Sequence, residues 1–179
     1  MNNLRNTIII TVLSFSAMIS GQSYLYQAKL YSSNLDAFTG LWEYKTSSES
    51  FRILLKKGNI NTKLSLGECI IGDYYFQSNG ILKDTYNETK IPSEVNDLNQ
   101  DQIIIYANNG RVKEKHVDKF ELYMYFSDKQ LNKKAFSCRT KFISPTQIRW
   151  ILADDEGPVD SDFALGFSIP TDVILTKIQ

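Results

Sequence analysis

The sequence predicts an all-β fold: a single antiparallel up-and-down barrel of about eight to nine strands, preceded by a signal peptide. Segments of strand length follow one another from residue 41 to residue 178, separated by turn residues. Aromatic residues make up 12% of the chain, mainly as Tyr and Phe, which favour strands. No segment after the signal keeps a helical period over three turns, so parallel strands would lack crossover helices. Antiparallel strands in this number must hide their edges, and closure into a barrel does so.

The chain divides into a signal peptide, residues 1–21, and one barrel domain, residues 22–179. Arg5 supplies the positive start of the signal, residues 7–19 form its apolar centre, and small residues that suit cleavage follow. The apolar centre is too short to span a bilayer as a helix, and no later segment is long and apolar enough to do so. We therefore expect an exported protein, periplasmic or secreted, with no membrane span in the mature chain.

Alternation of apolar and polar residues, with turn residues between, places the individual strands. Asn79-Gly80 between two apolar segments predicts a hairpin, and Gly58 indicates the end of a strand. Residues 87–100 are polar and contain Pro92, so we expect a loop there with room for a helical turn, and residues 35–38 suit a single helical turn. The predicted strands cover residues 41–46, 50–57, 67–77, 81–86, 102–107, 120–126, 135–143, 146–153 and 173–178.

The first strand opens with Phe38-x-Gly40-x-Trp42, which resembles the first motif of the lipocalin family. That resemblance implies an eight-stranded antiparallel barrel in which Trp42 plugs the closed end and a late basic residue packs over the indole. We name Arg149 with Gly40 and Trp42 as this structural plug, and Lys177 is the alternative basic residue. The second lipocalin motif, a Thr-Asp-Tyr type of turn, is not clearly present, so the expected barrel is lipocalin-like.

Most of the chain after the signal also resembles a family of uncharacterised exported proteins from Gram-negative bacteria. The resemblance rests on three stretches of the chain, residues 38–42, residues 51–57 and residues 167–177. The family has no assigned activity, so the resemblance implies export and a shared fold but no function.

Charge and cysteine content restrict the partners and the chemistry. The chain has 20 basic and 20 acidic residues, so no basic excess exists to bind nucleic acid. Cys69 and Cys138 have two interpretations, which stay open: a disulfide favoured by export, or two buried free thiols. Their wide spacing, without clustered histidines, does not suit a metal site.

Catalytic motifs are not recognisable in the sequence. His116 is the only histidine and lies in a charged stretch with no legible nucleophile or orienting partner. The acidic residues between 154 and 162 do not have the spacing of an EF-hand and are typical of a solvated turn. We expect no enzyme activity, no cofactor and no metal.

The aromatic residues on predicted strands are the candidate ligand contacts. Tyr74, Phe76, Tyr123 and Tyr125 lie on strands of which one face must point into the barrel. They either line a cavity for a small apolar ligand or simply fill the interior. The expected function is therefore binding of a small apolar or amphipathic ligand without catalysis. The alternatives are a structural or protein-interaction module with a filled core and a hydrolase that uses loop carboxylates, and the sequence leaves the oligomeric state undetermined.

Overall fold

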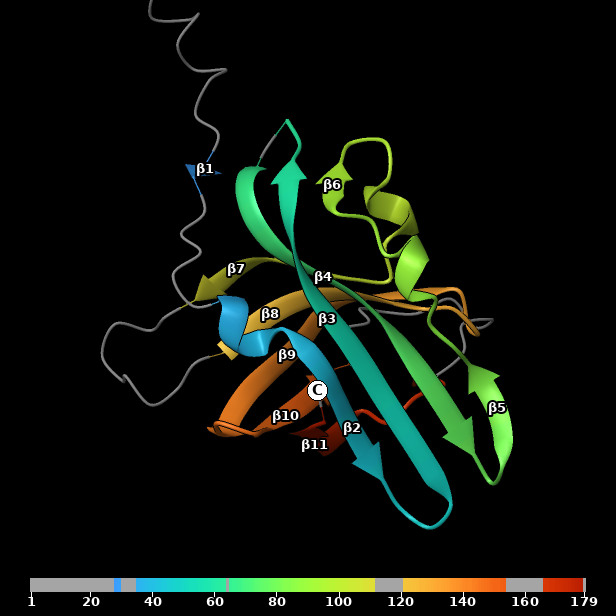
Figure 1. Cartoon of the computed structure of the whole chain (residues 1–179). Helices are drawn as coiled ribbons and strands as arrows, with labels where there is room; N and C mark the ends of the chain where they lie inside the picture. The colour runs from blue at the N-terminus through green and yellow to red at the C-terminus, as the bar shows by residue number, and fades with distance from the viewer. Residues whose placement is uncertain (1–27, 30–34, 64, 112–120, 154–165, 179) are drawn as a thin grey trace, which may run out of the picture.

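A closed antiparallel barrel of eight strands forms the body of the protein in the computed structural model, which describes residues 28–29, 35–63, 65–111, 121–153 and 166–178 (Figure 1). Each strand pairs with the next along the chain, and β11 closes the barrel on β2. The predicted up-and-down barrel is thereby confirmed. None of the helices in these ranges is long and apolar enough to cross a membrane. The barrel strands are β2 (Gly40–Lys45), β3 (Glu49–Asn61), β4 (Ser65–Ser78), β7 (Ile105–Arg111), β8 (Glu121–Asp128), β9 (Lys133–Ser144), β10 (Gln147–Leu152) and β11 (Asp172–Lys177).

Short elements outside the barrel add to its wall. β1 (Ala28–Lys29) pairs parallel with β4, β5 (Ile81–Asp84) pairs antiparallel with β4, and β6 (Glu94–Asn96) pairs parallel with β3. The predicted Asn79-Gly80 hairpin is present, and both residues have positive φ. The expected helical turn is the 3-10 helix η1 (Leu35–Phe38). The region predicted as a loop contains β6 and the 3-10 helix η2 (Glu88–Lys90), and a further 3-10 helix, η3 (Gln100–Gln102), begins at its last residue.

The strand predicted to end near Gly58 continues through it. The glycine is needed there because the backbone at Ser93 lies close against it. A Cβ at Gly58 would lie 2.8 Å from the Ser93 carbonyl oxygen and would also overlap the Ile71 side chain. The Asn59 N–H donates to the same Ser93 oxygen at 3.0 Å. The glycine therefore serves packing of the segment before β6 against β3, and the prediction of a strand end was wrong.

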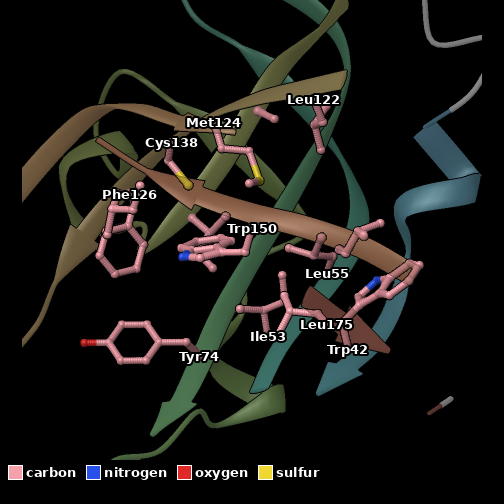
Figure 2. Close-up of a cluster of buried hydrophobic side chains, with 14 of the residues drawn as sticks. Trp42, Ile53, Leu55, Tyr74, Leu122, Met124, Phe126, Cys138, Trp150 and Leu175 are labelled. Atoms are coloured by element: carbon pink, nitrogen blue, oxygen red, sulfur yellow. The ribbon is translucent and has the colours of Figure 1, made fainter. Parts of the chain in front are cut away.

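Large apolar side chains fill the interior of the barrel. Trp42, Phe51, Tyr74 and Trp150 are among the fully buried side chains of one continuous cluster. Ring contacts tie this cluster together: the Phe51 and Trp150 centroids lie 5.5 Å apart. Figure 2 shows Trp42 on one side of the cluster and Tyr74 on the other. These observations favour a filled interior over an interior lined for a ligand.

A second, smaller cluster lies on the outer face of β3 and β4. Val95 and Ile103 come from the segment between β5 and β7, and they pack on Ile60, Cys69 and Ile71. Because β4 is covered on both faces here, its sequence runs apolar without alternation over residues 69–71. This outer cluster fixes the segment that carries η3, and η3 forms part of the candidate site.

Candidate functional site

The predicted plug residue Trp42 is fully buried. Its indole Nε1 donates to the Phe38 carbonyl oxygen at 2.8 Å, and Gly40 has a φ of 120°. The cation over the indole is Lys177, whose Nζ lies 5.2 Å from the ring centroid. Arg149 therefore has a different place from the one predicted.

Arg149 lies on the outer face because its two neighbours on β10, Ile148 and Trp150, both point into the core. Its Nε and an Nη donate to the two carboxylate oxygens of Asp172, at 2.7 and 2.6 Å. This bidentate pair lowers the pKa of the Asp172 carboxyl. It has no part in the plug.

The four predicted ligand contacts do not form one site. Tyr74 and Phe76 point into the barrel and are 0% and 6% exposed, whereas Tyr123 and Tyr125 are 37% and 36% exposed. The physical reason is strand alternation: the even-numbered residues of β8 from 122 to 128 are buried, so its two tyrosines face outward. Tyr125 stacks on Tyr106 of β7, with ring centroids 4.5 Å apart.

Cys69 and Cys138 are both free and buried, which is the second of the two interpretations that the sequence left open. Cys69 belongs to the outer cluster and Cys138 to the main core. Burial raises the pKa of the Cys69 thiol to about 12 and also raises that of Cys138. Both side chains therefore act as small apolar core residues.

Two features considered for chemistry in the sequence, His116 and the acidic stretch 154–162, lie outside the described residues. Within the parts of the chain that the structure describes, no three His, Cys, Asp or Glu side chains come together as metal ligands.

A hollow on the outer surface, which we call the η3 hollow, lies between η3 and the start of β9. Its volume is about 220 Å³. Its lining combines aromatic and apolar residues with polar side chains. The first group is Ile103, Tyr106, Tyr125, Phe126 and Ala135, and the second is Gln100, Asp101, Ser127 and Lys134.

Two asparagines direct the chain into this hollow. The Asn96 side-chain oxygen accepts from the N–H groups of Leu98 and Asn99, at 3.0 and 3.2 Å. The Asn99 side chain accepts from the Asn96 N–H and donates to the Glu94 carbonyl oxygen, each at 2.8 Å. These local bonds form a turn that leads into η3 and presents Asp101 at the rim of the hollow.

The polar rim of the η3 hollow is electrically neutral. The Lys134 Nζ donates to an Asp101 carboxylate oxygen at 2.8 Å, and both side chains remain largely in solvent. Burial, together with Tyr125 and Asp101, raises the pKa of the Tyr106 hydroxyl to about 12. At neutral pH the hollow therefore offers an uncharged phenol beside a paired carboxylate and ammonium.

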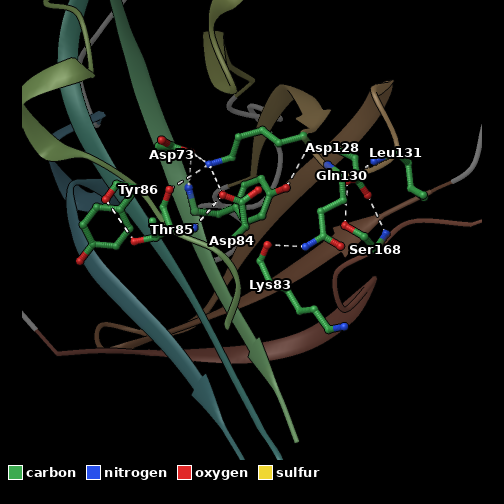
Figure 3. A network of polar contacts seen from close by, with 11 residues as sticks. Asp73, Lys83, Asp84, Thr85, Tyr86, Asp128, Gln130, Leu131 and Ser168 are labelled. Atoms are coloured by element: carbon green, nitrogen blue, oxygen red, sulfur yellow. Dashed lines mark hydrogen bonds and ion pairs between the residues drawn. The ribbon is translucent and has the colours of Figure 1, made fainter. Parts of the chain in front are cut away.

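A second polar arrangement closes the barrel wall near Tyr74. β4 pairs with β7 at residues 70–72 and with β5 at residues 76–78, so residues 73–75 have no strand neighbour on that edge among the described residues. The Lys129 Nζ, from the turn between β8 and β9, lies 2.9 Å from an Asp73 oxygen and 2.7 Å from an Asp84 oxygen (Figure 3). The same ammonium lies 4.5 Å from the Tyr74 ring centroid. Side chains thus replace backbone pairing along this edge of β4, at residues 73–75, which we call the Lys129 seam.

The same turn holds the chain that leads into β11. Asp128 is fully buried, and its carboxylate accepts from the Ser168 N–H at 2.6 Å and from the Ser168 hydroxyl at 2.7 Å. Gln130 donates its side-chain N–H to the Lys83 carbonyl oxygen on the outer edge of β5. This turn therefore joins β5, β4 and the approach to β11, which suits a structural role.

Of the residues that line the η3 hollow, the sequence identified Tyr125 as a candidate ligand contact, although on the interior of the barrel. Asp101, Lys134 and the contacts of Lys129 were missed. One signal was present: the unbroken apolar residues 69–71 indicate a strand covered on both faces, and hence a segment packed outside the barrel. That signal predicts a cover over β4 but does not identify Asp101 or Lys134, which are ordinary charged residues in the sequence.

Comparison with known proteins identifies the family of the chain. No curated protein and no solved structure is significantly similar to the chain. A family model matches residues 1–178, nearly the whole sequence. The chain therefore belongs to DUF6705, a family of unknown function.

Proposed function

We propose that the protein is an exported binding protein that takes a small amphipathic ligand in the η3 hollow and catalyses no reaction. The observation that carries this proposal is the combination, in one hollow, of the stacked Tyr106–Tyr125 pair with the neutral Asp101–Lys134 rim. Concave sites with an aromatic wall and a few polar groups are the usual form of small-molecule sites. The filled barrel then acts as the rigid scaffold.

The size of the hollow limits the ligand. Sites for drug-sized molecules have volumes of roughly 300–1,000 Å³, and the η3 hollow has about 220 Å³. The ligand that fits is therefore a single ring with its substituents, or one ring at the end of a larger molecule.

Export rests on the N-terminal sequence. Arg5, the apolar residues 7–19 and the small residues after them have the order of a signal peptide. Absence of catalysis is part of the proposal: the carboxylates of Asp73 and Asp84 both bind the Lys129 ammonium, an arrangement that ties neighbouring segments of the barrel wall together.

The test is a binding titration with neutral single-ring compounds, phenol and methyl β-D-glucopyranoside, followed by ligand-observed NMR. At least one compound should bind saturably, and Tyr125→Ala should weaken its binding about tenfold or more because the stacked wall is lost. Tyr123→Ala is the matched control: Tyr123 lies two residues away on the same face of β8, with nearly equal exposure, and does not line the hollow. The affinity of Tyr123→Ala for the compound should stay within about twofold of that of the wild type.

Two results would overturn the proposal. One is that neither compound binds a protein that is otherwise folded. The other is that Tyr125→Ala and Tyr123→Ala change binding equally.

A structural or protein-interaction module is the second candidate, and the filled core favours it. The aromatic cluster around Phe51 and Trp150 occupies the interior, where a barrel with a ligand cavity would keep space. If no ring compound binds, this candidate replaces the first.

A further inference from the structure

From the chemistry of the η3 hollow, we infer that its ligand is a neutral saccharide ring, either free or at the end of a glycan. This inference rests on the proposed function and narrows it to one class of ligand. Three properties of the hollow lead to it: its charge, its supply of hydrogen-bonding groups and the arrangement of its aromatic wall.

The charge of the η3 hollow disfavours ionic ligands. Among the described residues that line the hollow, the charged ones are Asp101 and Lys134, and they form an ion pair of zero net charge. A carboxylate or phosphate on the ligand would compete with Asp101 for the ammonium, and an amine on the ligand would compete with Lys134 for the carboxylate. A neutral ligand can accept from the one and donate to the other without separating them.

The number of polar groups favours a ligand that carries several hydroxyls. Gln100 can donate and accept, Ser127 and the Tyr106 phenol can do both, Lys134 donates and Asp101 accepts. A flat aromatic ring with one substituent would engage one or two of these groups and would exclude water from the rest, which is costly. A pyranose ring carries hydroxyls around its rim that are both donors and acceptors, so it can engage the mixed set.

The aromatic wall supplies the complementary apolar contact. Tyr106 and Tyr125 are nearly parallel, with an interplanar angle of 16°, and Ile103 and Ala135 continue the apolar side of the hollow. The face of an aromatic ring is electronegative and attracts the weakly positive C–H groups that one face of a pyranose ring presents. A ring that carries both C–H groups and hydroxyls therefore matches a hollow whose lining combines two tyrosines with polar side chains.

The experiment compares binding of methyl β-D-glucopyranoside, methyl β-D-galactopyranoside, phenol, glucuronate and glucosamine to the purified protein by titration. We expect at least one neutral glycoside to bind more tightly than phenol, glucuronate and glucosamine. Tyr125→Ala should weaken that binding by about tenfold, and Tyr123→Ala is again the control.

Charge variants sharpen the test. Asp101→Asn leaves Lys134 unpaired at the rim. The affinity for glucuronate, relative to that for the neutral glycoside, should rise by roughly two- to fivefold, as expected for an exposed charge. Lys134→Gln should raise the relative affinity for glucosamine by a similar factor. Because both side chains are exposed, neither variant should lose its fold.

The outcomes separate the two proposals. Binding of phenol with loss in Tyr125→Ala, and no binding of any glycoside, would overturn the saccharide and leave the η3 hollow as a ligand site. Binding of glycosides that Tyr125→Ala does not weaken would overturn the saccharide site in the hollow. No binding of any compound would overturn both proposals.

Discussion

Trp42 shows at the scale of a single residue how a short sequence motif became a structural feature. The indole is fully buried, bonds to Phe38 and lies under the Lys177 ammonium. The motif could be recognised in the sequence, which left its basic partner open between Arg149 and Lys177. Lys177 pairs with Trp42 across the strands that close the barrel, and that register is a property of the folded chain.

Trp42→Ala should lower the free energy of unfolding by about 3–5 kcal/mol, because it leaves a large cavity in a packed core. Lys177→Ala should cost about 0.5–1 kcal/mol through loss of the cation–π contact. Arg149→Ala should change stability less than Lys177→Ala does, since its ion pair with Asp172 is exposed. Urea unfolding of the three variants measures these differences. A loss below about 1 kcal/mol for Trp42→Ala would contradict burial of the indole.

Cys69 and Cys138 should behave as two unreactive free thiols. Both are buried, and burial raises the pKa of each thiol. A thiol reagent should therefore label neither residue in the folded protein and both after unfolding in denaturant. Addition of a reductant should leave the midpoint of unfolding unchanged. If the unfolded protein shows no free thiol, and reductant lowers stability by several kcal/mol, a disulfide is present instead.

At the scale of the secondary-structure elements, the turn between β8 and β9 compensates for a gap in strand pairing. Residues 73–75 of β4 pair with β3 on one edge, and the Lys129 side chain covers the other. Sequence patterns predict which residues form strands, because alternation reflects burial of one face. They do not predict where a strand changes its neighbour, and so the partners of Lys129 were not foreseen.

Asp73 gives this seam a characteristic dependence on pH. Burial raises the pKa of its carboxyl, although Lys129 and the Tyr74 N–H lower it, and Asp84 adds to the rise. The folded-state pKa therefore lies above the unfolded value of about 3.9. Between the unfolded-state pKa and the raised folded-state pKa, the folded chain binds more protons than the unfolded chain. The free energy of unfolding therefore rises as the pH falls through this range.

We expect the stability of the wild type relative to Asp73→Asn to increase as the pH is lowered from 7 toward 4. Asp172→Asn is the control of opposite sign: Arg149 lowers the pKa of Asp172, so the wild-type advantage over that variant should shrink on acidification. Urea unfolding at a series of pH values measures both curves. If the stability advantage of the wild type over Asp73→Asn becomes smaller as the pH is lowered, Lys129 and not burial controls the pKa of the Asp73 carboxyl.

At the scale of the whole molecule, the sequence predicted the fold class well and the candidate site poorly. Strand alternation, the Asn79-Gly80 turn and the absence of helical periodicity suffice to predict an antiparallel barrel of about eight strands. The position of a surface hollow depends on which distant segments meet. Asp101 and Lys134 are 33 residues apart and come together only because the outer cluster holds η3 against the barrel.

The outward tyrosines illustrate the same limit. Tyr123 and Tyr125 were assigned to the barrel interior with Tyr74, yet the alternation along β8 already placed them opposite Leu122, Met124 and Phe126. The face of the strand on which the tyrosines lie determines where a ligand can contact them.

The central claim is that the barrel is a filled scaffold and that the ligand binds outside it, in the η3 hollow. Methyl NMR of the protein titrated with methyl β-D-glucopyranoside, and separately with phenol, tests this most directly. Ile103 lines the hollow and belongs to the outer cluster, whereas Ile53 and Leu175 lie in the main core. We predict saturable shifts of the Ile103 methyl signals, with those of Ile53 and Leu175 unchanged. Saturable shifts at Ile53 and Leu175, with Ile103 unaffected, would contradict the claim and place the ligand inside the barrel.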